Sequence, residues 1–84
     1  MSAGIEGRPV KHSLTLRGHR TSVSLEDSFW RAFREIAAER DMPINALAIE
    51  IDEARGDIGL ASAIRVHVLR HYRGLLGSGF ITNR

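Results

Sequence analysis

Histidine and serine side chains are the residues of this 84-residue chain that could take part in catalysis or hold a metal. His67 and His71 are four residues apart, a spacing that brings two imidazoles onto one face of a helix, as in some zinc sites. The zinc-protease pattern needs a glutamate directly after the first histidine, but Val68 stands there, and the chain has no cysteine. Because no set of acid, base and nucleophile can be assembled, we expect no enzyme activity, no metal site and no cofactor.

Hydrogen-bonding side chains recur at every second position between residues 20 and 25. Arg20, Ser22 and Ser24 alternate with larger or less polar residues, which is the pattern of a half-buried strand. One face of this strand therefore presents side chains that can donate and accept hydrogen bonds. An alternative role for the Ser24 hydroxyl is to cap the helix that follows, because Ser24 and Asp27 fit the capping-box pattern.

The net charge of +2 conceals a separation of charge along the chain. Residues 1–25 and 60–84 are basic, whereas residues 26–59 contain four arginines against nine acids. Basic segments at both ends of the chain suit a polyanion that is contacted from particular faces. The alternative is that the basic ends simply complement the acidic middle within the fold.

Length and composition predict one small soluble domain. A chain of 84 residues cannot hold a second core, and 43% hydrophobic residues are ordinary for a globular protein. No apolar run reaches the length of a membrane span, and the amino terminus lacks the apolar segment of a secretory signal. We therefore expect a cytoplasmic protein with no membrane contact. Without cysteines for disulfides, so small a chain gains stability mainly by oligomerisation.

The spacing of apolar residues predicts three helices, at about residues 27–40, 43–55 and 60–73. The apolar positions of the first two are Phe29, Trp30, Phe33, Ile36, Leu47 and Ile51. The third has a broad apolar face, which suggests burial against two surfaces. We expect a disordered arm over residues 1–9, a domain over 10–73 and a flexible tail over 74–84, after Gly74 ends the third helix.

The strand should extend upstream to about residue 13, but its alternation reverses near Gly18. An uninterrupted strand over 13–25 would place Leu14 and Leu16 on the same face as Arg20 and Ser22. Either a bulge at Gly18 restores the pattern within one long strand, or the chain turns there into a hairpin. We expect the bulge, because the turn lacks an Asn-Gly or Asp-Gly pair.

A single strand cannot satisfy its own backbone, and the sequence after it shows no second strand. The simplest source of a partner strand is another copy of the chain. This arrangement resembles the ribbon-helix-helix family of Arc, MetJ and CopG relatives, and in particular a subgroup with a Gly-His-Arg-Thr-Ser-x-Ser-Leu-Glu strand. Residues 18–26, together with Phe29-Trp30, match that subgroup as they stand.

The resemblance implies a fold that is mostly α with one amino-terminal strand. It would be a homodimer with an intermolecular two-stranded antiparallel ribbon and an additional third helix. The dimer core would comprise Val23, Leu25, Phe29, Trp30, Phe33, Ile36, Leu47 and Ile51.

The resemblance also implies that the ribbon lies in the major groove of double-stranded DNA. Arg20, Ser22 and Ser24 would contact base edges. Phosphate contacts would come from Lys11, Arg17, His19, Ile44 and Asn45.

We therefore expect a sequence-specific DNA-binding protein, a transcriptional regulator or repressor that acts as a homodimer and is associated with the nucleoid when bound to DNA. One alternative is an antitoxin of the same fold. Another is a protein-interaction module that does not bind DNA. A protein partner would bind through the third helix or the tail.

Overall fold

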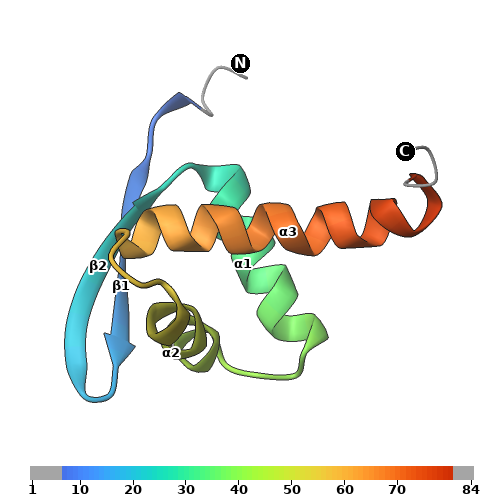
Figure 1. Ribbon diagram of the computed structural model, residues 1–84. Helices are drawn as coiled ribbons and strands as arrows, with labels where there is room; N and C mark the ends of the chain where they lie inside the picture. The colour runs from blue at the N-terminus through green and yellow to red at the C-terminus, as the bar shows by residue number, and fades with distance from the viewer. Residues whose placement is uncertain (1–6, 81–84) are drawn as a thin grey trace.

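The computed structural model describes residues 7–80 of the chain, which form two strands followed by three helices. The strands are β1 (Val10–Leu16) and β2 (His19–Leu25), and the helices are α1 (Asp27–Glu39), α2 (Ile44–Ala54) and α3 (Leu60–Phe80). Figure 1 shows the hairpin at the left of the molecule, with the three helices to its right. Most of the arm expected over residues 1–9, and residues 81–84 of the expected tail, lie outside the described residues.

The two strands form an antiparallel hairpin within one chain, with Leu16 paired to His19. Arg17 and Gly18 make the turn, and both have positive φ, 52° and 82°, as a type I′ hairpin requires. The expected bulge at Gly18 is therefore wrong. A two-residue turn also explains the reversed alternation, because directly paired residues of two strands point to the same face.

The second strand of the ribbon is the segment just upstream of the turn. The strand expected over residues 13–25 is two strands, and β1 supplies the backbone partner that we expected from a second copy. The inference that another protein chain must complete the ribbon is thus corrected. The intermolecular ribbon is replaced by an intramolecular one.

The core lies between the inner face of the hairpin and the three helices. Leu14, Leu16, Val23 and Leu25 are buried on the hairpin side. The buried helix residues are Phe33, Ile36, Ala37, Leu47, Ala48, Ile51, Ala63, Ile64 and Val68. Phe29 and Trp30, which we expected in a dimer core, are partly buried against this single-chain core. Within the described residues no polar or charged side chain is buried.

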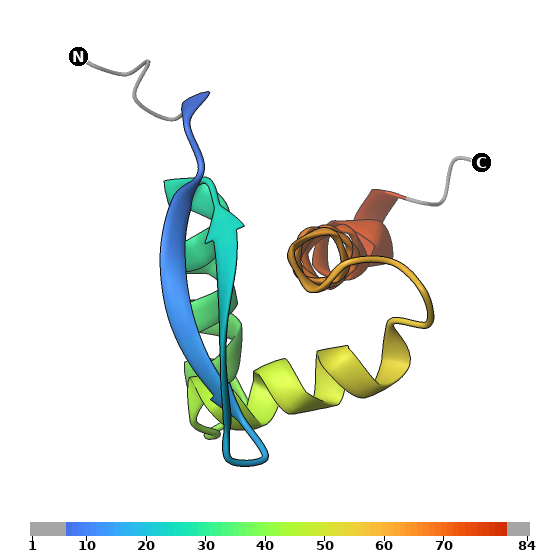
Figure 2. The same ribbon diagram turned by 90° about the vertical axis from the view of Figure 1, so that its left-hand side faces the viewer.

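Helix α3 is longer than expected. It continues through Gly74 to Phe80, so the expected helix end at Gly74 is wrong. A glycine inside a helix costs only about 1 kcal/mol relative to alanine, which is too little to end the helix by itself. Figure 1 shows the carboxyl-terminal half of α3 extending past α1, away from the hairpin. In Figure 2, which looks onto the hairpin, α3 is seen nearly end-on.

Candidate nucleic-acid interface

The outer face of the hairpin carries six exposed polar side chains in three cross-strand pairs. Lys11 pairs with Ser24, Ser13 with Ser22, and Thr15 with Arg20. Counting from the two-residue turn, these are the pairs without mutual backbone hydrogen bonds, in which opposite side chains lie closest together. We call these six residues the outer face; it contains two cations, four hydroxyls and no acid.

Arg20, Ser22 and Ser24 all lie on this face, as the alternation predicted. Ser24 does not cap α1: the N-cap residue is Glu26, and no side chain caps the helix. The Ser24 hydroxyl is therefore left at the surface. Sequence reasoning missed Ser13 and Thr15 as members of the same surface. The available signal was the alternation of β1, whose polar positions face outward once the strands are joined by a tight turn.

The turn end of the hairpin is attached to α2. The guanidinium of Arg17 pairs with the carboxylate of Glu53 and lies 3.9 Å from that of Asp52. The Thr15 backbone amide donates to the Asn45 side-chain oxygen at 3.0 Å. The Arg17 side chain, which we expected to contact phosphate, is thus engaged by α2, and the Asn45 side chain helps to fix the hairpin on the same helix.

The open end of the hairpin is attached to α3 through Arg65. Its Nε donates to Glu26 at 2.9 Å, its second terminal nitrogen donates to the Ser24 carbonyl at 3.3 Å, and the guanidinium lies 5.8 Å from the centroid of the Phe29 ring. A backbone hydrogen bond at Glu26 and the Arg65 guanidinium lower the pKa of the Glu26 carboxyl. The third helix therefore holds the junction between β2 and α1.

A stacked pair of rings adds to the attachment at the open end. The His12 imidazole lies parallel to the Trp30 indole, with a centroid distance of 3.9 Å and an interplanar angle of 4°. Trp30 is therefore occupied by an intramolecular contact rather than presented to solvent for stacking. The hairpin is thus attached to the helices near both of its ends.

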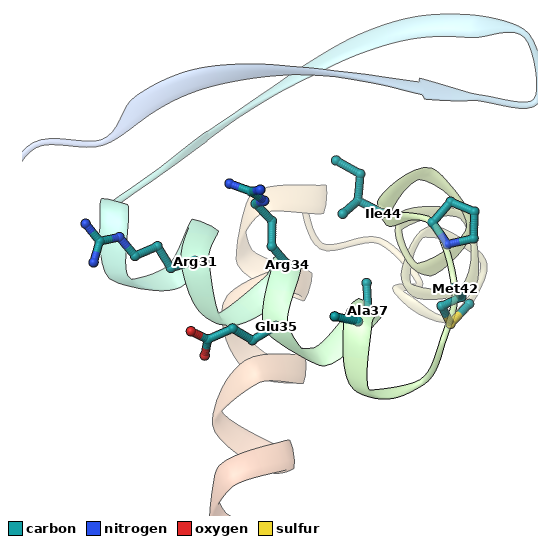
Figure 3. Close-up of a pocket in the computed structure, with 8 residues that line it drawn as sticks. Arg31, Arg34, Glu35, Ala37, Met42 and Ile44 are labelled. Carbon is teal, nitrogen blue, oxygen red and sulfur yellow. The ribbon is translucent and has the colours of Figure 1, made fainter.

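A shallow hollow lies beside the hairpin, between α1 and the start of α2. It is lined by Arg31, Arg34, Glu35, Ala37, Ala38, Met42, Pro43 and Ile44. Figure 3 shows Arg34 extending from α1 on the hairpin side, with Ile44 pointing the same way from α2. As the first residues of α2, Ile44 and Asn45 have amides with no acceptor one turn earlier in the helix. The hollow therefore combines helix-start amides with an arginine that sequence reasoning missed.

Ion pairs within the fold engage most of the acidic middle segment. Asp27 pairs with Arg31, Glu50 with Arg40, and Asp52 with Arg55, while Glu26 and Glu53 pair with Arg65 and Arg17. The basic ends thus do complement the acidic middle in part. Within the described residues, Lys11, Arg20, Arg34, Arg70, Arg73 and Arg8 have no ion pair. The first three lie on the outer face or beside the hairpin, and His19 is exposed at the turn end of β2.

Across residues 7–80, no group of three or more potential ligands could hold a metal. The Nε2 atom of His71 lies 3.1 Å from a carboxylate oxygen of Glu39. No helix in the same part of the chain is long and apolar enough to cross a membrane.

Comparison with known proteins identifies one family that matches the chain. A family model for the ribbon-helix-helix domain matches residues 9–72, which include both strands, α1, α2 and the first part of α3. Members of this family are generally DNA-binding transcriptional regulators or antitoxins, and typically bind DNA as dimers. No curated protein and no solved structure matches the chain. Because the matched segment covers most of the chain and the structure has the corresponding ribbon and helices, the protein belongs to the ribbon-helix-helix family.

Proposed function

We propose that the protein is a sequence-specific DNA-binding protein, acting as a transcriptional regulator, that places its own hairpin in the major groove. The outer face carries this proposal, because its six exposed side chains are all hydrogen-bonding residues and none is acidic. Two antiparallel strands lie about 4.8 Å apart, and the major groove is about 12 Å wide, so a two-stranded ribbon fits it.

Arg20 is the residue best suited to read a base. Its guanidinium can donate two hydrogen bonds to O6 and N7 of a guanine, and no carboxylate in the described part of the fold competes for it. Ser22 and Ser24 can donate to or accept from either type of base pair. Ser13 and Thr15 bring the same capacity from β1, and the Thr15 methyl group can also contact a thymine methyl.

Phosphate contacts would flank the ribbon on the side of the hollow. Arg34 and Ile44 line the hollow, and Asn45 follows Ile44 in the first turn of α2; a helix start with free amides suits a phosphate group. Lys11 lies directly opposite Ser24 on the outer face, so it reaches either a base edge or a phosphate. His19 remains a proposed phosphate contact at the turn.

We further propose that the protein is a repressor that binds a palindromic or repeated operator as a homodimer. It would act in the cytoplasm, where the nucleoid lies. Because each chain already contains a complete ribbon, a homodimer would present two ribbons. The two copies would then read two half-sites rather than build one reader between them.

The test begins with selection of bound duplexes from a random pool by the wild-type protein. Binding to a selected and a scrambled duplex is then measured over a range of salt concentrations. Arg20→Ala should weaken binding to the selected duplex by about 1–3 kcal/mol and relax base choice at one position. Arg70→Ala is the matched control, because it removes an arginine without an ion pair from α3.

The Lys11→Ala variant distinguishes recognition of bases from attraction to the phosphates, which does not depend on sequence. If Lys11 binds a phosphate, its removal weakens both duplexes alike and lowers the salt slope by about one for each phosphate that is no longer neutralised. An equal loss on both duplexes for Arg20→Ala would show that Arg20 binds phosphate and that the outer face does not read sequence. Absence of wild-type binding to any duplex at low salt would refute DNA binding.

A further inference from the structure

The side of α3 that faces away from the core carries an apolar stripe. Val66, Leu69 and Leu76 are 39%, 54% and 64% exposed. Together with Arg73 they follow a three- and four-residue spacing, which places them along one line of the helix. The opposite side of the helix buries Ile64 and Val68 in the core, so the stripe is additional to the surface that holds α3 in the fold.

The charge on this surface has one sign. The 21 residues of α3 include no aspartate or glutamate. Arg65 is paired with Glu26 across the fold, but Arg70 and Arg73 have no ion pair within the described residues. Two leucines and a valine therefore lie beside two arginines that have no ion pair. A molecule that binds this surface should supply apolar groups for the stripe and acidic groups for the arginines.

A second copy of the chain does not fit this surface. Packing α3 against α3 of another copy would bring Arg70 and Arg73 close to the same residues of its partner. The remainder of the chain offers few acids, because those near its surface are mostly engaged by its own arginines. Glu35, Asp41 and Asp57 have no ion pair in the described part, but Glu35 accepts a hydrogen bond from Tyr72 of the same chain, and the two aspartates lie in separate loops.

Nucleic acid also fits this surface poorly, because exposed leucines contribute nothing to phosphate contacts. We propose that the outward side of α3, comprising Val66, Leu69, Arg70, Arg73 and Leu76, binds an acidic amphipathic helix of another protein. Leucine-type side chains of that helix would cover the stripe, and its carboxylates would pair with Arg70 and Arg73. This inference does not depend on the proposed DNA contact.

The position of α3 allows both surfaces to be used at once. In Figure 1 the hairpin and the carboxyl-terminal half of α3 lie at opposite sides of the molecule. A helix bound on α3 would therefore leave the outer face of the hairpin open.

The test uses the full-length protein and three labelled helical peptides of about 20 residues, a length comparable with that of α3. One has leucine along one side and glutamate on the other, the second has lysine in place of each glutamate, and the third has glutamine in place of each leucine. Fluorescence anisotropy should show saturable binding of the leucine–glutamate peptide only. Leu69→Ser should weaken it at least about tenfold, as removal of a central apolar side chain does.

Charge reversal supplies the second arm. The double variant Arg70→Glu with Arg73→Glu should lose the leucine–glutamate peptide and gain the leucine–lysine peptide. Arg20→Ala, which removes one arginine from the hairpin, should leave peptide binding unchanged. Circular dichroism of each variant confirms that the fold is kept.

Four results would overturn the proposal. The first is no saturable binding of the leucine–glutamate peptide, and the second is binding that survives both Leu69→Ser and the charge reversal. The third is self-association of the wild type in sedimentation that Leu69→Ser abolishes, which would make a second copy the occupant. The fourth is binding of a DNA duplex or of anionic phosphatidylglycerol vesicles that Leu69→Ser abolishes.

Discussion

His67 lies half-buried between α2 and α3, and its environment disfavours the charged imidazole. Burial lowers the pKa of His67 below its ordinary value of 6.5; Arg40 and His71 act in the same direction, while Glu50 opposes them. In the unfolded chain the imidazole takes up its proton at about 6.5, before the folded protein does. Between the two pKa values the unfolded state binds more protons, so the free energy of unfolding falls as the pH falls.

His67→Gln should therefore flatten the loss of stability on acidification below about pH 6.5. Chemical denaturation at a series of pH values measures this slope. His19→Gln makes the same change at an exposed position of the hairpin and serves as the control. Equal slopes for wild type and His67→Gln would show that protonation of this histidine does not influence folding.

At the residue scale, much of the outer face was predictable. The alternation of Arg20, Ser22 and Ser24 predicts which side chains face outward, and the structure agrees. The role of Arg17 was not predictable, because its acidic partners on α2 are more than 30 residues away in sequence. Arg34 was missed for a related reason: its place beside the hairpin depends on how α1 packs, which helical periodicity alone does not give.

At the element scale, the hairpin turn and the end of α3 are where sequence reasoning failed, and both concern a glycine. The reversed alternation around Gly18 fits a bulge or a turn, and the absence of an Asn-Gly or Asp-Gly pair favours the bulge, whereas the structure has the turn. Arginine at the first turn position accepts φ of 52°, and the ion pair with Glu53 helps to hold it there. The glycine at position 74 predicts a helix stop, but α3 continues on both sides of it.

These two glycines make a matched pair of substitutions, because an added Cβ meets nothing within 4 Å at either position. Gly18→Ala should lower the free energy of unfolding by about 1 kcal/mol, since alanine is strained at positive φ. Gly74→Ala should instead raise helicity and stabilise by up to about 1 kcal/mol. Urea denaturation with circular dichroism measures both. Stabilisation by Gly18→Ala would contradict the tight turn.

Helix α3 offers a second matched pair, one residue buried and one exposed. Ile64 is 0% exposed, so Ile64→Ala should cost about 2–5 kcal/mol by leaving a cavity. Leu69→Ala removes a similar volume from the outward stripe and should change stability by less than about 0.5 kcal/mol. The free energy of unfolding from denaturant titration decides between these outcomes. A small effect of Ile64→Ala would mean that α3 is not part of the folded core.

At the scale of the whole molecule, the ribbon-helix-helix class was predictable because the strand motif and three amphipathic segments are local features of the sequence. The source of the second strand was not. A short strand with reversed alternation fits either a bulged strand in a dimer or a hairpin in one chain, and the choice depends on turn geometry that the residue types alone did not decide. The resemblance favoured the bulged strand, which the pairing of β1 with β2 in the same chain contradicts.

The in-chain hairpin predicts that folding does not require a second copy. At concentrations where sedimentation gives a monomer, circular dichroism should still show the helix and strand content of the folded protein. The physical reason is that the inner face of the hairpin is already covered by helices of its own chain. Loss of secondary structure on dissociation would show instead that the hairpin depends on a partner.

If the protein binds DNA as proposed, the intramolecular hairpin determines how expression of a target gene depends on the concentration of the protein. When one ribbon must be built from two chains, DNA-bound regulator rises with the square of the free monomer concentration, so regulation switches on above a threshold. Here each chain carries its whole ribbon between Val10 and Leu25. Occupancy of an isolated half-site would then rise in direct proportion to monomer at low levels, and the output of a regulated promoter would be graded rather than switch-like. Any steepness would have to come from cooperation between neighbouring half-sites.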